Sequence, residues 1–205
     1  MSLAIPQAFK CPVCSTPLSV SLWQSVNVTV DPDLKIRVLD GSINCVKCAN
    51  CGRTTRIENN LLYHDMDKGF MVSLRRDRVR NEAFPLKGLT LRIVFDYDSL
   101  VEKIRILDAD LSDFTIEVIK YYCWEKTTGK KPSEFRWDEI RFVCRGKVNN
   151  VDSLVFGCKT SDGPQTIGFP YSKYASSASE MCSESSKLFP KGKWHVIDDS
   201  LRQHR

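Results

Sequence analysis

Two C-x-x-C motifs near the N-terminus constrain the fold of this 205-residue chain more than any other feature. They are Cys11-Pro12-Val13-Cys14 and Cys48-Ala49-Asn50-Cys51. A C-x-x-C turn places two sulfur atoms on the same side of a tight loop, and two such turns facing each other supply four thiolates with tetrahedral geometry. The spacing therefore predicts one structural Zn²⁺ bound by Cys11, Cys14, Cys48 and Cys51.

The residues around the two motifs fit this prediction unequally. Gly52 follows the second motif and allows the left-handed backbone that closes such a turn, whereas Ser15 occupies that position after the first. The 33 residues between the motifs (15–47) exceed the 15–20 or so of a compact ribbon. A short helix explains the excess: Asp31 is its expected N-cap, Pro32 its first residue, and Gly41 its end.

Two further residues, Cys45 and His64, are alternative candidates for a metal ligand. Cys45 also forms a C-x-x-C motif with Cys48, so spacing alone leaves this pairing open. The Cys48–Cys51 pair is preferred because Gly52 follows it, which puts Cys45 on the strand that enters the turn. His64 is the spare nitrogen ligand, but the sequence around it predicts a hairpin.

Redox and disulfide chemistry are the alternatives to zinc. A redox C-x-x-C opens a helix, and Pro17 with the strand-like residues after it disfavours one here. Nine cysteines are an odd number, and no secretory signal precedes them, so a disulfide framework is disfavoured as well. Four single cysteines lie in or beside apolar segments and are expected to be small buried core residues. They are Cys123, Cys144, Cys158 and Cys182.

Composition favours a soluble, cytoplasmic protein. Hydrophobic residues make up 42% and charged residues 27% of the chain, and no apolar stretch approaches the 18–20 or so residues of a membrane span. The net charge of +5 is modest for a nucleic-acid-binding protein. The one basic cluster, which we expect to be a solvated linker with phosphate contact as the alternative, consists of Arg75, Arg76, Arg78 and Arg80.

The remaining patterns predict an α+β fold. Residues 26–30 and 89–95 alternate as strands, with a helix as the alternative for 89–95, and Gly69 marks a hairpin. A capping box from Ser99 to Glu102 and a cap at Ser112 open a central pair of helices. Residues 139–145, 153–159 and 165–169 predict an antiparallel meander, followed by an amphipathic helix to residue 188. We place a domain boundary between residues 128 and 129, and leave open that 1–128 and 129–205 pack as one unit.

These residues resemble the CpXC family of small bacterial and archaeal proteins over roughly residues 9–125. The resemblance rests on the two cysteine motifs and on segments 28–34, 41–44, 61–65, 102–104 and 111–113. The chain departs from the family pattern by Ala49, where the second motif carries proline, and by the additional Cys45. The resemblance implies a zinc-ribbon-like cysteine site and implies nothing about a substrate.

The function that these features predict is a non-enzymatic zinc-stabilised module that binds a protein or another macromolecule, with a protein as the expected partner. Four thiolates close the coordination sphere of zinc and leave no position for a reactive water. The alternatives are a nucleic-acid-binding or regulatory zinc ribbon, and an enzyme whose general base would be His64 or His195. No G-x-S-x-G, phosphate-binding glycine loop or H-E-x-x-H motif supports the enzyme.

Overall fold

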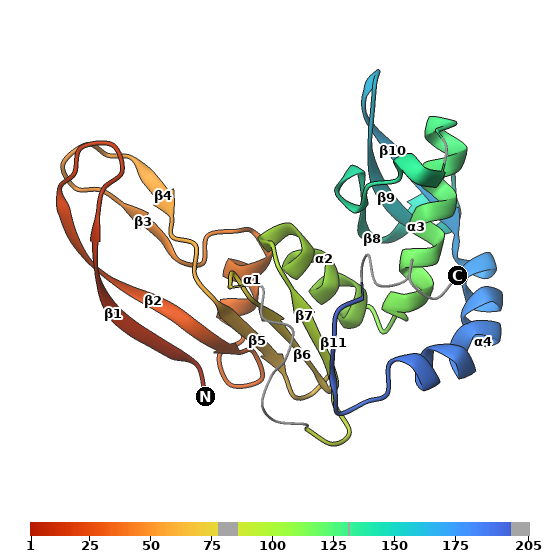
Figure 1. The fold of residues 1–205 in the computed structure, drawn as a ribbon, viewed down its shortest axis with the longest axis horizontal. Helices are drawn as coiled ribbons and strands as arrows, with labels where there is room; N and C mark the ends of the chain where they lie inside the picture. Colours follow the sequence, from red (N-terminus) through yellow and green to blue (C-terminus); the bar gives the residue numbers. More distant parts are fainter. Residues whose placement is uncertain (78–85, 131, 198–205) are drawn as a thin grey trace. The chain divides into compact units, whose positions relative to one another are not determined.

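The computed structural model describes residues 1–77, 86–130 and 132–197, which form two compact units. The first is Met1–Val101, and the second begins at Glu102, within helix α2 (Tyr97–Asp108). Each unit contains helices and strands, which confirms the predicted α+β class (Figure 1). The domain boundary expected between residues 128 and 129 stays a prediction, which limited proteolysis would test.

The first unit is built on a mixed sheet in which its strands follow the order β1-β2-β5-β6-β7. β1 with β2 and β5 with β6 are antiparallel, whereas β2 with β5 and β6 with β7 are parallel. The bounds of these strands are Leu3–Lys10 for β1, Pro17–Asn27 for β2, Leu61–Asp65 for β5, Phe70–Leu74 for β6 and Thr90–Val94 for β7. The hairpin predicted around Gly69 and the strand predicted at 89–95 are thus confirmed.

A short helix and a two-stranded ribbon fill the spacer between β2 and β5. They are α1 (Asp33–Leu39), β3 (Cys45–Lys47) and β4 (Thr54–Arg56), with β3 and β4 antiparallel. The helix was predicted, but its cap was not: Pro32 is the N-cap and no side chain caps it. The strand expected at 26–30 is also wrong beyond Asn27. There the Asn27 side chain accepts the Thr29 N–H at 3.1 Å and turns the chain.

Helix α2 begins two residues before the predicted capping box. Its first turn is capped by Asp96, whose carboxylate accepts the Ser99 N–H at 2.8 Å, so Ser99 is not the cap. Glu102 makes no capping contact because its Oε1 accepts the Phe142 N–H at 2.6 Å. The inner face of α2 includes Leu100 and Ile104, which are fully buried.

The second unit packs helices on an antiparallel meander of order β10-β9-β8, which confirms the predicted meander. Its core includes the fully buried Trp124, Phe142 and Phe156. Ser112 caps α3 as predicted, since its side chain accepts the Thr115 N–H. The elements are α3 (Asp113–Thr128), the 3-10 helices η1 (Pro132–Glu134) and η2 (Trp137–Glu139), β8 (Ile140–Val148), β9 (Val151–Thr160), β10 (Gly163–Pro170), α4 (Tyr171–Leu188) and β11 (Trp194–His195).

The single cysteines divide between core and surface. Cys123 and Cys158 are buried as predicted, but Cys144 is exposed. The register of β8 shifts between Phe142 and Cys144. Cys144 therefore no longer lies on the face of the strand that points into the core. The side chain of Cys182 lies outside the described part of the chain. None of the helices in that part combines the length and the hydropathy that a membrane-spanning helix needs.

Candidate metal centre

The first C-x-x-C turn connects the hairpin strands β1 and β2. Its backbone closes on itself, because the Ser15 N–H donates to the Cys11 carbonyl at 2.9 Å and the Cys11 N–H to the Thr16 carbonyl at 3.0 Å. Ser15 adopts a left-handed conformation with φ of 58°, although it is not glycine. The hairpin thus holds both thiols of the motif on one tight turn.

The second C-x-x-C turn repeats this pattern between β3 and β4. The Gly52 N–H donates to the Cys48 carbonyl at 2.9 Å, the Cys48 N–H donates to the Arg53 carbonyl at 2.9 Å, and Gly52 has φ of 71°. The left-handed glycine predicted here is confirmed. In Figure 1 the β1–β2 and β3–β4 turns lie side by side at one end of the first unit.

The four sulfur atoms of these turns lie within 4.8 Å of one another. Two sulfur pairs join the two turns, Cys11 to Cys51 at 3.6 Å and Cys14 to Cys48 at 3.6 Å. A tetrahedral zinc site with Zn–S distances near 2.3 Å separates its sulfur atoms by about 3.8 Å. The residues present therefore fit a divalent metal ion such as Zn²⁺ in donor type, number and spacing.

The thiols of the cluster differ in pKa, most clearly Cys14 and Cys51. Hydrogen bonds from the Thr16 side chain and backbone, and from the Asn50 side chain, lower the pKa of Cys14 to about 5. The Arg53 backbone favours the Cys51 thiolate, but lost hydration and the neighbouring sulfur atoms outweigh it and raise the pKa of Cys51 to about 11. Four thiols at this spacing resist full ionisation unless a cation joins them.

Neither alternative ligand belongs to the cluster. Cys45 lies on β3, as predicted, and its Sγ contacts the Gly41 carbonyl oxygen at 3.2 Å. His64 lies half-buried on β5, and burial lowers the pKa of its imidazole. His195, the second candidate for a general base besides His64, is on β11, where its Nε2 lies 3.1 Å from the Pro190 carbonyl oxygen.

The arginine cluster that follows β6 is partly engaged within the first unit. Arg75 donates to both carboxylate oxygens of Asp77, and Arg76 pairs with Glu58. Arg78 and Arg80 lie outside the described residues. The described arginines of the cluster are therefore held by carboxylates of the chain itself.

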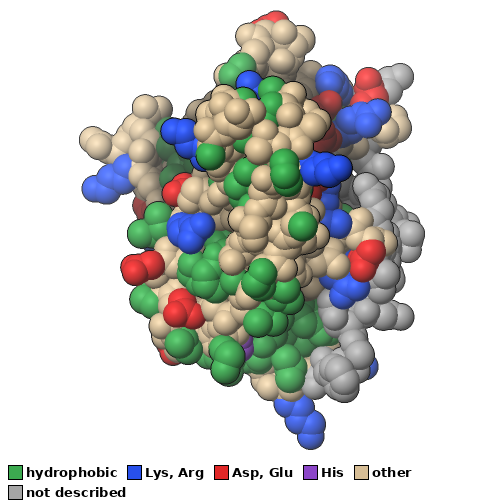
Figure 2. All heavy atoms as spheres, turned by 90° about the vertical axis from the view of Figure 1, so that its left-hand side faces the viewer, with side chains coloured by type: hydrophobic (Ala, Val, Ile, Leu, Met, Phe, Trp, Pro, Cys, Tyr) green, Lys and Arg blue, Asp and Glu red, His purple; other side chains and the backbone are tan. Residues whose placement is uncertain are grey.

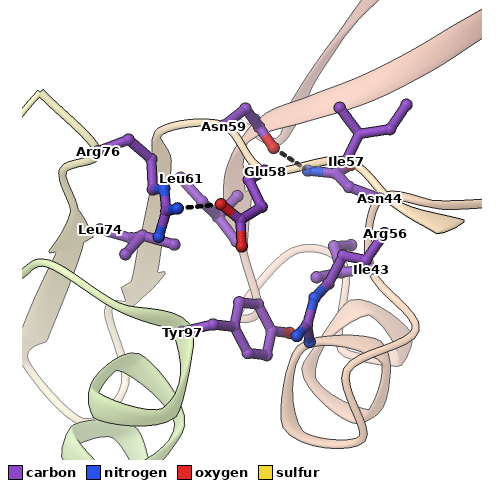
Figure 3. A pocket seen from close by; sticks show the side chains of 10 residues that line it. All are labelled: Ile43, Asn44, Arg56, Ile57, Glu58, Asn59, Leu61, Leu74, Arg76 and Tyr97. Atoms are coloured by element: carbon purple, nitrogen blue, oxygen red, sulfur yellow. Dashed lines mark hydrogen bonds and ion pairs between the residues drawn. The ribbon is translucent and has the colours of Figure 1, made fainter. Parts of the chain in front are cut away.

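A small pocket at the base of β4 was not foreseen from the sequence (Figure 3). Its walls include the Arg56 guanidinium, 4.2 Å above the Tyr97 ring, and the Arg76–Glu58 ion pair. The Tyr97 hydroxyl donates to the Val38 carbonyl at 2.5 Å. Its ten lining residues come from separate segments between Ile43 and Tyr97, so no local motif signals it.

Two cysteine turns on two β hairpins, with four sulfur atoms brought together, define a protein with a four-cysteine cluster that could hold a metal ion. A model of the family described as CpXC protein matches residues 9–120, which is more than half of the chain. The chain therefore belongs to the CpXC family, and the resemblance drawn from the motifs is confirmed. No curated protein and no solved structure matches the chain significantly.

Proposed function

We propose that Cys11, Cys14, Cys48 and Cys51 bind one structural Zn²⁺ and that the first unit is a non-enzymatic module that binds a protein. The observation that carries the proposal is the convergence of the four sulfur atoms within 4.8 Å. Zinc would supply folding free energy here, of about 10–16 kcal/mol in small model sites. Four thiolates would complete its coordination, so a structural role fits this donor set better than metal-assisted hydrolysis.

Exposed apolar side chains support a protein as the partner. Leu3 and Ile5 on strand β1, which forms an edge of the sheet, are 49% and 46% exposed, and Val13 in the first cysteine turn is 62% exposed. Figure 2 shows hydrophobic side chains gathered in the lower half of this side of the first unit. Apolar surface of this kind is typical of sites that bind another protein.

The metal proposal is tested on the full chain purified without added metal. Elemental analysis is expected to find about one zinc per chain. Cys48→Ser is expected to lose that zinc, because it removes one of four ligands, whereas Cys45→Ser, three residues away and outside the cluster, is expected to keep it.

Either of two results contradicts the metal proposal. One is a wild-type chain with less than about half an equivalent of zinc, since structural zinc sites are occupied at far lower free concentrations. The other is equal zinc content in the Cys48→Ser and Cys45→Ser chains. That result would show that the second turn does not contribute the ligands proposed.

Nucleic acid is the second candidate partner, and the charges around the cysteine turns favour it. Residues 1–30 and 41–57 contain no Asp or Glu. Lys10, Lys47 and Arg53 next to the turns are exposed and make no ion pair with any residue that the structure describes. Three phosphate contacts would give a log–log salt slope of about −2 on single strands.

Paired variants separate the two classes of partner. We expect a protein to co-purify from the native host with the wild-type chain, and to be lost with Leu3→Ser/Ile5→Ser but kept with Lys10→Glu/Lys47→Glu. A labelled oligonucleotide that binds the wild type and not the lysine variant would favour nucleic acid instead. Identical co-purifying proteins for all three chains would contradict the apolar surface proposed here.

A further inference from the structure

A hydrogen-bond relay joins the two cysteine turns without involving the cysteine backbone. The Thr16 hydroxyl oxygen lies 3.2 Å from the Cys14 sulfur, and the Asn50 side-chain amide donates to the same hydroxyl oxygen at 3.1 Å. Thr16 follows the first turn, whereas Asn50 lies inside the second. The relay therefore links the two halves of the cluster through side chains 34 residues apart.

The chemistry of the relay sets the direction of its hydrogen bonds. A threonine hydroxyl has one hydrogen to donate and two lone pairs to accept with, and an asparagine amide nitrogen can only donate. Because Asn50 donates to the Thr16 oxygen, the hydroxyl hydrogen is left for the Cys14 sulfur. A thiolate accepts such a charge-assisted hydrogen bond well, which restricts where its remaining lone pairs point.

The relay has no counterpart in the other half of the cluster. The cysteine turns are alike in backbone hydrogen bonds, so the equivalents of Thr16 and Asn50 are Arg53 and Val13. Val13 has no polar atom in its side chain. The side-chain interactions of the Cys51 sulfur are with the other three cysteine sulfur atoms, Cys11 among them at 3.6 Å. The asymmetry shows that turn geometry alone does not require the relay.

We propose that Thr16 and Asn50 are positioning residues of the metal centre, which hold the Cys14 sulfur toward the ion and the two turns at ligand distance. This inference rests on the zinc site proposed above. Hydrogen bonds to metal ligands commonly contribute 10–100-fold to metal affinity. Thr16 is half-buried and Asn50 is exposed, so water replaces the Asn50 contact more easily.

The test compares zinc affinity by chelator competition at constant pH. Thr16→Val keeps the branched side chain and loses the hydroxyl, and is expected to bind zinc about 10-fold more weakly. Thr16→Ser keeps the hydroxyl and is expected to restore wild-type affinity. Asn50→Ala is expected to weaken binding about threefold. Val13→Ala, at the equivalent position of the other turn, serves as the control and is expected to change nothing.

Cobalt substitution provides a spectroscopic signal that would not change if Thr16 and Asn50 only stabilised the fold. The thiolate-to-metal charge-transfer band of the Co²⁺ chain is expected to shift in Thr16→Val and to return in Thr16→Ser. Affinity within twofold of wild type and an unshifted band in both Thr16→Val and Asn50→Ala would overturn the relay while leaving the zinc site intact. A wild-type chain that binds no zinc would overturn both proposals. If Thr16→Val does not fold, the exposed Asn50→Ala variant decides the outcome.

Discussion

Each cysteine turn is closed by a residue in the left-handed backbone conformation, which is a serine in the first turn and a glycine in the second. Ser15 and Gly52 both have positive φ, 58° and 71°, because their N–H groups must return to the carbonyl of the first cysteine. A side chain in this conformation costs about 1–2 kcal/mol, which glycine avoids. The serine of the first turn therefore departs from the expected glycine without changing the turn.

Gly52→Ala measures this backbone cost at the residue scale. A Cβ at Gly52 would meet no atom within 4 Å, so only the positive φ opposes it. We expect the free energy of unfolding to fall by about 1 kcal/mol in chemical denaturation with saturating zinc.

The control for this prediction is Gly146→Ala. Gly146 lies outside the glycines with positive φ, and its Cβ would meet only the Cys144 sulfur at 4.0 Å. We expect this variant to be neutral or slightly stabilising. Equal losses in both variants would show that the positive φ of Gly52 does not decide the effect.

At the scale of elements, a buried network of charges joins α2, α3 and β8 in the second unit. The charged side chains of five of its residues are at most 5% exposed, and that of Arg141 is 26% exposed. Glu102 contacts Lys120 at 3.0 Å and Arg141 at 3.0 Å, and Lys120 contacts Glu117 at 2.8 Å. The members of the network are Glu102, Lys103, Asp113, Glu117, Lys120 and Arg141.

Three acidic and three basic side chains leave this network without formal net charge. Buried ions lose hydration at a cost of several kcal/mol each, so removal of one partner leaves an uncompensated charge. The network also explains why α3 is buried at Asp113, Glu117 and Lys120, positions that an amphipathic pattern would assign to the surface. Pairing with neighbouring elements therefore decides the orientation of this helix.

Glu102→Gln tests the network through the pH dependence of stability. Burial opposes the Glu102 charge, but Lys120, Arg141 and the Phe142 N–H outweigh it and hold the pKa of Glu102 below its usual value. A lowered folded-state pKa stabilises the fold above the unfolded value of about 4.3, and this stabilisation is lost as the pH falls through the folded-state pKa. We expect Glu102→Gln to cost about 3–5 kcal/mol at neutral pH.

Urea unfolding at neutral pH and at about pH 3 measures this difference. The cost of Glu102→Gln is expected to shrink at the lower pH, because the wild-type carboxylate then loses its advantage. Glu125→Gln on helix α3 is the control, since Glu125 makes no ion pair with any described residue. A cost of Glu102→Gln that does not change with pH would contradict the assignment of Glu102 as a buried anion.

At the scale of the whole molecule, the cysteine turns belong to two separate sheets, so no strand ladder sets the distance between them. The buried Asn44 supplies a connection. Its side chain accepts the Trp23 N–H at 2.8 Å and donates to the Trp23 carbonyl at 3.0 Å. The same amide donates to Asn59 at 2.8 Å. Asn44 thereby ties the β3–β4 ribbon to strand β2 in the manner of a neighbouring strand.

The sequence by itself determined the features that depend on neighbours along the chain. The cysteine turns, the hairpin at Gly69, the Ser112 cap and the meander each follow from interactions over a few residues. The capping box at Ser99 shows the limit of such signals. Asp96 caps that helix, and Glu102 is drawn into a network with residues of other elements.

Only the tertiary structure decided which cysteines meet and which side chains are buried. Spacing allowed Cys45 as well as Cys51 to pair with Cys48, and the close approach of the two cysteine turns brings Cys51, not Cys45, into the cluster. Similarly, a shift of register exposes Cys144, and distant partners bury Lys120. These outcomes depend on contacts between segments far apart in the chain, whose geometry no local pattern of residues contains.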